Sequence, residues 1–329
     1  MQLPRTVLKL SRPDFQIDNQ AVVGCMSAQN EFRVVRERNV MVPMRDGIKL
    51  ATDVFRPDAS GRFPVLVTRG PYSKDAYADN PDASVQFFPK HGYVVVSQDC
   101  RARFESEGES YNPLFQEVQD GYDTVEWAAR QPWSNGRVGT TGQSYLGATQ
   151  YTLATSNPLP PHLQVIAPVS ASADFHQSWV YHTGGAMEWG WMVPYAIFKG
   201  RNTLSRGGHE KLLSQMDEYV LPPDNFAQPL KDEWYRHLPL SDWTNRLKET
   251  APYFKEYLDN EADGPYWSQI NLLRHAGGIT LPMFHVSSWY DIFLEGALNA
   301  YQAIRDGGGS ELAKRNQRLL IGPWAHIRP

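Results

Sequence analysis

The chain has 329 residues, of which 41% are hydrophobic and 21% are charged, and these proportions exclude disordered, collagen-like and coiled-coil classes. Its 32 Lys and Arg against 36 Asp and Glu give a net charge of −4, so charge favours neither a nucleic acid nor an anionic membrane as a partner. No signal-peptide core and no membrane-length apolar segment is found, which predicts a cytoplasmic protein.

The N-terminal part of the chain predicts an extension followed by β-strands. Residues 1–30 are polar without a clear period and are expected to form the extension. Asp46-Gly47 separates two β-like runs, Phe32–Val42 and Ile48–Phe55, which is typical of a hairpin. Two short runs rich in β-branched residues suit strands that are buried on both faces of a parallel sheet: Phe63–Thr68 and Tyr93–Ser97.

Helical and strand patterns then alternate, which predicts an α/β fold with a mostly parallel sheet. The expected helices are Glu117–Arg130, Tyr145–Thr155 and Glu295–Arg305, and the expected strands are Arg137–Thr140, Val165–Ala167, Leu281–Ser287 and Arg318–Ile321. Between residues 175 and 274 the alternation stops and tryptophans are frequent. We therefore expect a core of residues 31–174 and 275–329, with residues 175–274 inserted as a helical cap.

Ser144 occupies a segment that reads as a strand, a tight turn and a helix. A serine at such a turn projects above the edge of the sheet, and the first N–H groups of the following helix point towards it. Glycine is needed where the backbone crosses closely, and Gly142 and Gly147 flank the serine in the order G-x-S-Y-x-G. The pattern predicts a nucleophile, although a glycine-rich turn with a serine N-cap would have the same sequence.

Two later loops supply the partners that a nucleophilic serine needs. A base must accept the serine proton, and a carboxylate must orient the base. Asp291 and His326 each follow a predicted strand, in the chain order serine, acid, histidine that is used on this fold. Singly, Asp291 is compatible with a helix N-cap and His326 with an ordinary loop histidine, but together they predict a catalytic triad.

Over residues 42–326 the chain resembles the family of serine hydrolases that includes bacterial cocaine esterase and X-prolyl dipeptidyl-peptidases. The spacing G-x-S-Y-x-G is that family's own form of the turn. The resemblance implies an α/β-hydrolase core with a helical cap and a triad of Ser144, Asp291 and His326. The motifs that carry it are Met44–Leu50, Arg69–Tyr72, Asp99–Arg103, Ser106–Gly108, Gly142–Gly147, Gly184–Ala186, Trp289–Phe293 and Gly322–His326.

The resemblance also implies an oxyanion hole made by the Tyr72 hydroxyl and the backbone N–H of Tyr145. From the residues alone, the preferred interpretation of Tyr72 is a tyrosine that follows Pro71 and only packs at a strand end. Three aromatic residues are expected to line the substrate pocket: Trp179, Phe293 and Trp289. The predicted chemistry requires no cofactor and no metal.

Two departures from the family pattern bear on the substrate. Family members usually continue into a C-terminal β jelly-roll domain, which we do not expect in this chain. The acidic cluster that receives the ammonium group of amino-acid esters has no counterpart in residues 174–182. We therefore expect a serine hydrolase of carboxylesterase or amidase type, which cleaves small acyl substrates through an acyl-enzyme.

Two alternatives remain open at this point. The first is an X-prolyl dipeptidyl-peptidase, for which Glu188 is the candidate to receive the substrate amine. The second is an inactive or binding-only fragment that lacks its C-terminal domain. The expected partner is a small-molecule ester or amide, not a nucleic acid or a membrane, and a homo-oligomer is compatible with the sequence.

Overall fold

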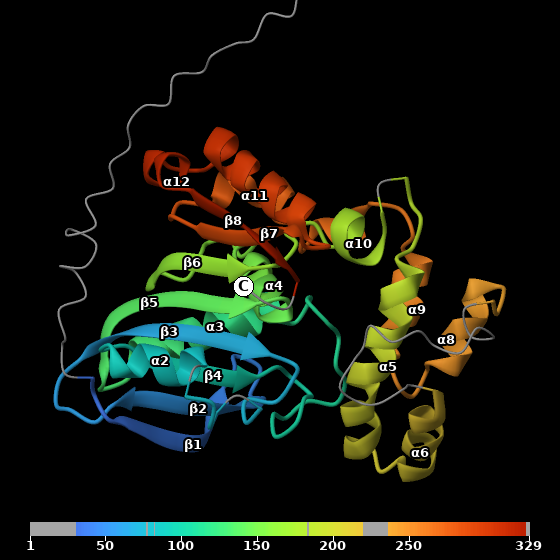
Figure 1. Cartoon of the computed structure of the whole chain (residues 1–329), viewed down its shortest axis with the longest axis horizontal. Coiled ribbons are helices and arrows are strands. Elements are labelled where there is room, and N and C mark those ends of the chain that lie inside the picture. Colours follow the sequence, from blue (N-terminus) through green and yellow to red (C-terminus); the bar gives the residue numbers. More distant parts are fainter. Residues whose placement is uncertain (1–30, 77, 82, 183, 220–235, 327–329) are drawn as a thin grey trace, which may run out of the picture. The chain divides into compact units, whose positions relative to one another are not determined.

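An eight-stranded sheet forms the centre of the computed structural model (Figure 1). Its strand order is β1-β2-β4-β3-β5-β6-β7-β8. The pairs β1–β2 and β2–β4 are antiparallel and the other pairs are parallel, which confirms the predicted mostly parallel α/β sheet. The structure describes residues 31–76, 78–81, 83–182, 184–219 and 236–326. The predicted extension, residues 1–30, lies outside them.

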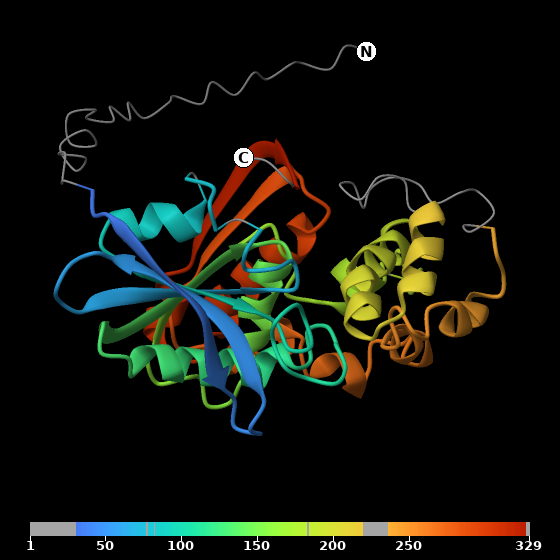
Figure 2. The same cartoon turned by 90° about the horizontal axis from the view of Figure 1, so that it is seen from below.

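The strands and the helices packed on them account for most of the described core. The strands are β1 (Val34–Pro43), β2 (Lys49–Pro57), β3 (Phe63–Gly70), β4 (Val94–Asp99), β5 (Ser134–Gln143), β6 (Leu163–Val169), β7 (Phe284–Tyr290) and β8 (Arg318–Ala325). The helices are α2 (Ser84–Lys90), α3 (Glu117–Ala129), α4 (Tyr145–Leu153), α11 (Leu294–Gly307) and α12 (Glu311–Arg315). Helices α2 and α3 lie on opposite sides of the strands (Figure 2).

The predicted hairpin is confirmed by the pairing of β1 with β2. Pro43 lies opposite Lys49, and the turn is closed by the Met44 N–H, which donates to the Ile48 carbonyl at 2.8 Å. Gly47 has a φ of +88°, a conformation that glycine adopts without a steric cost.

The strands in the middle of the sheet are buried on both faces, as their continuous apolar runs predict. All six residues of β4 are buried, and Val65 and Val67 of β3 pair with Val94 and Val96 of β4. Helices α3 and α4 contact each other and cover β3 and β5. The result is a rigid sheet whose parallel strands end at a common edge.

The structure differs from the sequence expectations at several element ends and in one additional helix before β4. Strand β7 begins at Phe284, three residues later than predicted, because Pro282 has no N–H to donate to a ladder. Strand β8 continues to Ala325, four residues beyond the predicted end, so that His326 follows the strand directly. The short helix α2 was not expected; it contains a proline, Pro89, which weakens a helical pattern.

Helical elements occupy the stretch for which the sequence predicts a cap. They are η1 (His176–Val180), α5 (Trp189–Arg206), α6 (Glu210–Tyr219), η2 (Leu240–Asp242), α8 (Trp243–Arg246), α9 (Phe254–Asp259), α10 (Pro265–Ser268) and η3 (Leu272–Gly278). Among the residues described in this stretch, the recorded β pairing is the isolated bridge between Tyr181 and Met187. None of the described helices is both long and apolar enough to cross a membrane.

Candidate active site

Ser144 lies in a strained turn between β5 and α4. Its φ of 59° and ψ of −123° fall in a region that residues with a side chain rarely adopt. The turn is held from both sides: the Ser144 N–H donates to the Val169 carbonyl at 2.9 Å, and the Ser144 carbonyl accepts from the Gly147 and Ala148 N–H groups at 2.8 Å. The backbone therefore maintains a conformation that presents the serine side chain at the end of β5.

Close packing explains the spacing of the two glycines around this serine. At Gly142, whose φ is +148°, a Cβ atom would lie 2.5 Å from the Cβ of Leu146. At Gly147 it would lie 2.7 Å from the Cβ of Ala171 and 2.9 Å from the Val169 carbonyl oxygen. Helix α4 thus crosses β6 so closely that position 147 has no room for a side chain.

The structure brings Ser144, Asp291 and His326 into one chain of hydrogen bonds. His326 Nε2 is 2.9 Å from Ser144 Oγ, and His326 Nδ1 is 3.1 Å from Asp291 Oδ1. The three residues directly follow β5, β7 and β8, which are parallel strands that end at the same edge of the sheet. The Asp291 side chain is fully buried and that of His326 is 14% exposed, so little water competes for these bonds.

Asp291 has a second hydrogen bond that fixes its carboxylate. Its Oδ1 also accepts from the Phe293 N–H at 2.8 Å. Because Phe293 itself is the N-cap of α11, the N-cap role considered for Asp291 is wrong, and this hydrogen bond closes the turn before the helix. Burial raises the pKa of Asp291, but the interactions with His326, Ser170 and the Phe293 amide outweigh burial and hold that pKa below its ordinary value. The group is therefore ionised at neutral pH.

His326 is held by its backbone as well as by its ring. The Gln143 side-chain amide donates a hydrogen bond to the His326 carbonyl, which joins the residue before the serine to the histidine. The Phe293 ring packs edge-on against the imidazole, with centroids 5.2 Å apart. Both contacts restrict the imidazole to the position in which it meets Ser144.

Tyr72 and Tyr145, for which the resemblance implies an oxyanion hole, lie next to each other. Tyr72 follows β3, and its ring meets that of Tyr145 edge-on with centroids 6.4 Å apart. Tyr145 is the first residue of α4, so its N–H has no acceptor within the helix. The Tyr145 hydroxyl accepts from the Leu114 N–H at 2.9 Å and donates to Glu117 at 3.2 Å.

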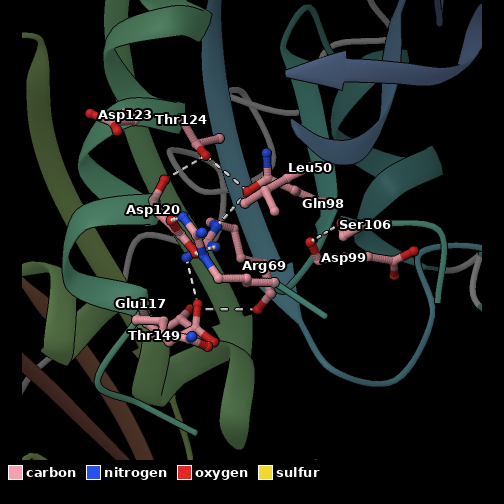
Figure 3. A network of polar contacts seen from close by, with 12 residues as sticks. Leu50, Arg69, Gln98, Asp99, Ser106, Glu117, Asp120, Asp123, Thr124 and Thr149 are labelled. Carbon is pink, nitrogen blue, oxygen red and sulfur yellow. Dashed lines mark hydrogen bonds and ion pairs between the residues drawn. The ribbon is translucent and has the colours of Figure 1, made fainter. Parts of the chain in front are cut away.

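A buried polar network around Arg69 joins β3, β4 and α3 (Figure 3). Arg69 donates to Gln98 and to Glu117, each at 2.6 Å, and both members of the Arg69–Glu117 pair are at most 3% exposed. Glu117 thereby links β3 to the Tyr145 hydroxyl. Arg69 belongs to a motif that is recognisable in the sequence, whereas nothing in the local pattern of Glu117 distinguishes it from other acidic residues of a helix.

Two of the three predicted pocket residues pack together beside the histidine. The rings of Trp179 and Phe293 are stacked at 4.3 Å with an angle of 4° between their planes, and Phe293 contacts His326. Trp289 is 63% exposed, and none of the ring contacts recorded among the described residues joins it to this pair. The structure does not bring Trp289 into the cluster.

The sequence is similar to those of known proteins. The sequence profile of the X-Pro dipeptidyl-peptidase (S15) family matches residues 46–328. Cocaine esterase from Rhodococcus sp. (strain MB1 Bresler) is 33% identical over 293 residues, which make up 88% of this chain and 48% of that protein. The chain spans about half the length of the curated relatives it matches.

Solved structures share the fold. An aminopeptidase from a Thaumarchaeota archaeon aligns with a TM-score of 0.68 at 22% identity, over 96% of this chain and 51% of that one. A CocE/NonD family hydrolase from Staphylococcus aureus aligns with a TM-score of 0.63 at 24% identity, over 89% and 47% of the two chains. With the profile match extending over most of the sequence, the chain belongs to the X-Pro dipeptidyl-peptidase (S15) family and has an α/β-hydrolase fold.

Proposed function

We propose that the protein is a serine hydrolase that cleaves ester or amide bonds of small acyl substrates through an acyl-enzyme. The observation that carries the proposal is the hydrogen-bonded chain from Ser144 Oγ through His326 to Asp291. Membership of a family of peptidases and esterases supports the same reaction class.

The geometry supports the following acylation step. His326 Nδ1–H donates to the ionised Asp291, which leaves Nε2 to accept the hydroxyl proton of Ser144. Ser144 Oγ then attacks the substrate carbonyl, and the imidazolium protonates the leaving alcohol or amine. Water, deprotonated by the same imidazole, attacks the acyl-enzyme and releases the acid.

The Tyr145 N–H and the Tyr72 hydroxyl are proposed to bind the oxyanion of the tetrahedral intermediate. The first N–H groups of a helix carry a partial positive charge that favours an anion at this point. Removing one such donor typically costs about 3–4 kcal/mol of barrier stabilisation. The two donors come from different elements, the end of β3 and the start of α4.

A neutral acyl group fits the site better than an ammonium group. Glu188, the candidate to receive a substrate amine, has its carboxylate in contact with the His182 imidazole, so it already has a partner within the protein. The stacked rings of Trp179 and Phe293 beside His326 provide an apolar wall for an acyl or aromatic group, and we propose these two as pocket residues.

The direct test compares Ser144→Ala with the wild-type protein. We expect hydrolysis of p-nitrophenyl acetate and labelling by a fluorophosphonate to disappear in Ser144→Ala, because the hydroxyl is the reacting group. Ser241→Ala, which removes an exposed hydroxyl of the cap, is the matched control and should behave as wild type. Undiminished labelling of Ser144→Ala would reject the assignment, and an inert wild-type protein would favour a binding-only fragment.

The family description makes an X-Pro dipeptidyl-peptidase the second candidate. The values of kcat/KM for p-nitrophenyl acetate and for Gly-Pro-p-nitroanilide distinguish the esterase from the peptidase. The contact between Glu188 and His182 predicts that the ester is the better substrate by kcat/KM. Preference for the X-Pro amide, lost in Glu188→Gln, would show instead that Glu188 binds the substrate amine.

A further inference from the structure

A second tyrosine of the cap meets the hydroxyl of Tyr72. Tyr195 lies on α5 and is only 4% exposed. Its Oη is 2.5 Å from Tyr72 Oη, and the two rings are T-shaped with centroids 6.5 Å apart. A short hydrogen bond between two phenols thus joins the loop after β3 to the cap.

The number of protons decides the direction of this bond. A phenol has one hydroxyl proton, and its oxygen accepts through lone pairs. When Tyr72 donates its proton to a substrate oxyanion, it has none left to donate to Tyr195. During the reaction, Tyr195 is therefore the donor and Tyr72 the acceptor.

Arg103 fixes the distance between the two tyrosines. Its side chain is 2% exposed and donates to the Pro71 carbonyl through Nε and Nη2, at 3.3 and 3.2 Å. Nη1 donates to the Lys199 carbonyl at 2.9 Å. One guanidinium thus holds both the residue before Tyr72 and the helical turn after Tyr195.

The surroundings of Tyr195 keep its hydroxyl protonated. Burial raises the pKa of Tyr195 well above its ordinary value, and the neighbouring Tyr72 adds to the effect. Lys199 Nζ lies 4.1 Å from the centroid of the Tyr195 ring and 5.3 Å from that of Tyr145, which restricts the ring on one face. A protonated, immobile phenol is well suited to donate a hydrogen bond of fixed direction.

We propose that Tyr195 is a positioning residue of the oxyanion hole: its hydroxyl donates to Tyr72 and so directs the Tyr72 proton towards the substrate oxygen. This inference rests on the proposed function, in which Tyr72 donates to the oxyanion. A hydrogen bond received by Tyr72 also polarises its O–H bond and strengthens the bond that it donates. Through Tyr195 the cap contributes to the chemical step.

The test is a double-mutant cycle on the acylation rate with p-nitrophenyl acetate. Tyr195→Phe removes the hydroxyl and keeps the ring, and we expect the rate per active site to fall about 10-fold with KM unchanged, as for the loss of one hydrogen bond. In a Tyr72→Phe background the same change should have no further effect, because Tyr195 acts through the Tyr72 hydroxyl. Active sites are counted by fluorophosphonate titration, which removes the contribution of misfolded protein.

Tyr257→Phe is the matched control, since it removes another buried hydroxyl of the cap and should leave the rate per active site unchanged. Equal losses from Tyr195→Phe in both backgrounds, or a wild-type rate in Tyr195→Phe while Tyr72→Phe is impaired, would overturn the inference and leave the proposed function intact. A wild-type rate in Tyr72→Phe would remove Tyr72 from the oxyanion hole and this inference with it. If the fluorophosphonate did not label Ser144 in the wild-type protein, that result would instead refute the proposed function itself.

Discussion

Asp291 orients the imidazole through a single carboxylate oxygen, Oδ1, which also accepts the Phe293 N–H. In Asp291→Asn the side-chain amide can donate to His326 Nδ1, which favours the tautomer that has its proton on Nε2 and cannot accept from Ser144. We expect kcat to fall about 10⁴-fold, as this change does in other serine hydrolase triads, while the far-UV circular dichroism spectrum is unchanged.

The control for this change is Asp306→Asn, which alters an exposed carboxylate on α11 and should leave kcat at the wild-type value. Both variants are compared by steady-state hydrolysis of p-nitrophenyl acetate. Wild-type kcat in Asp291→Asn would show that another group orients His326.

Residues that follow strand ends were predictable, and residues that meet across the fold were not. Ser144, Asp291 and His326 each stand at the end of a recognisable strand, and parallel strands end at one edge. Tyr195 contacts Tyr72 across 123 positions, in a segment whose tryptophan-rich sequence predicts only burial. Such a contact depends on how helix α5 packs against the loop after β3, which no local pattern encodes.

The close approach of helix α4 to strand β6 depends on Gly147. We expect Gly147→Ala to lower the free energy of unfolding by about 1–3 kcal/mol, as for overpacking of a core, because the added Cβ meets Ala171 and the Val169 carbonyl. Chemical denaturation measures the change. Gly190→Ala in α5, where a Cβ would have open space, is the control, and equal losses in both variants would contradict the packing argument.

The order and type of the strands and of helices α3, α4 and α11 followed from their patterns, but the ends of these elements did not. The apolar run from Leu281 predicted β7 correctly, whereas its start depended on Pro282, which cannot donate to the ladder. The end of β8 was set by pairing with β7, where Tyr290 lies opposite Ala325. The length of a strand in a sheet therefore depends on the neighbouring strand as well as on the strand's own sequence.

A buried histidine of β7, His285, links helix α4 to the residue directly before β8. His285 is 0% exposed; its Nδ1 is 2.7 Å from the Tyr151 hydroxyl and its Nε2 is 3.0 Å from Gln317 Oε1. The neutral ring satisfies both contacts, whereas a protonated ring could not accept from Tyr151. Burial lowers the pKa of His285 to about 4, although Gln317 opposes the shift.

This lowered pKa predicts a pH-dependent contribution to stability. The unfolded chain binds a proton at His285 near pH 6.5, whereas the folded protein binds one only near pH 4. The stabilisation that depends on neutral His285 is therefore fully present above pH 6.5, and the free energy of unfolding falls by about 3 kcal/mol as the pH drops to 4. We therefore expect the difference in unfolding free energy between wild type and His285→Gln to shrink over this range. Urea denaturation at several pH values measures it.

The control is His91→Gln, which replaces an exposed histidine after α2. It shows whether replacing any histidine by glutamine changes the pH dependence of the unfolding free energy. A difference between wild type and His285→Gln that stays constant from pH 7 to pH 4.5 would mean that His285 is not held neutral by the fold. The sequence did not identify His285 because a histidine within an apolar strand has no distinguishing pattern.

In the proposed reaction, Ser144 carries the acyl group. The most direct measurement is mass spectrometry of the protein after brief exposure to p-nitrophenyl acetate and acid quenching, followed by peptide mapping. We expect one acetyl group, located on Ser144 in the peptide that spans the turn and absent from Ser144→Ala. An acetyl group on another residue, or undiminished turnover in Ser144→Ala, would contradict it.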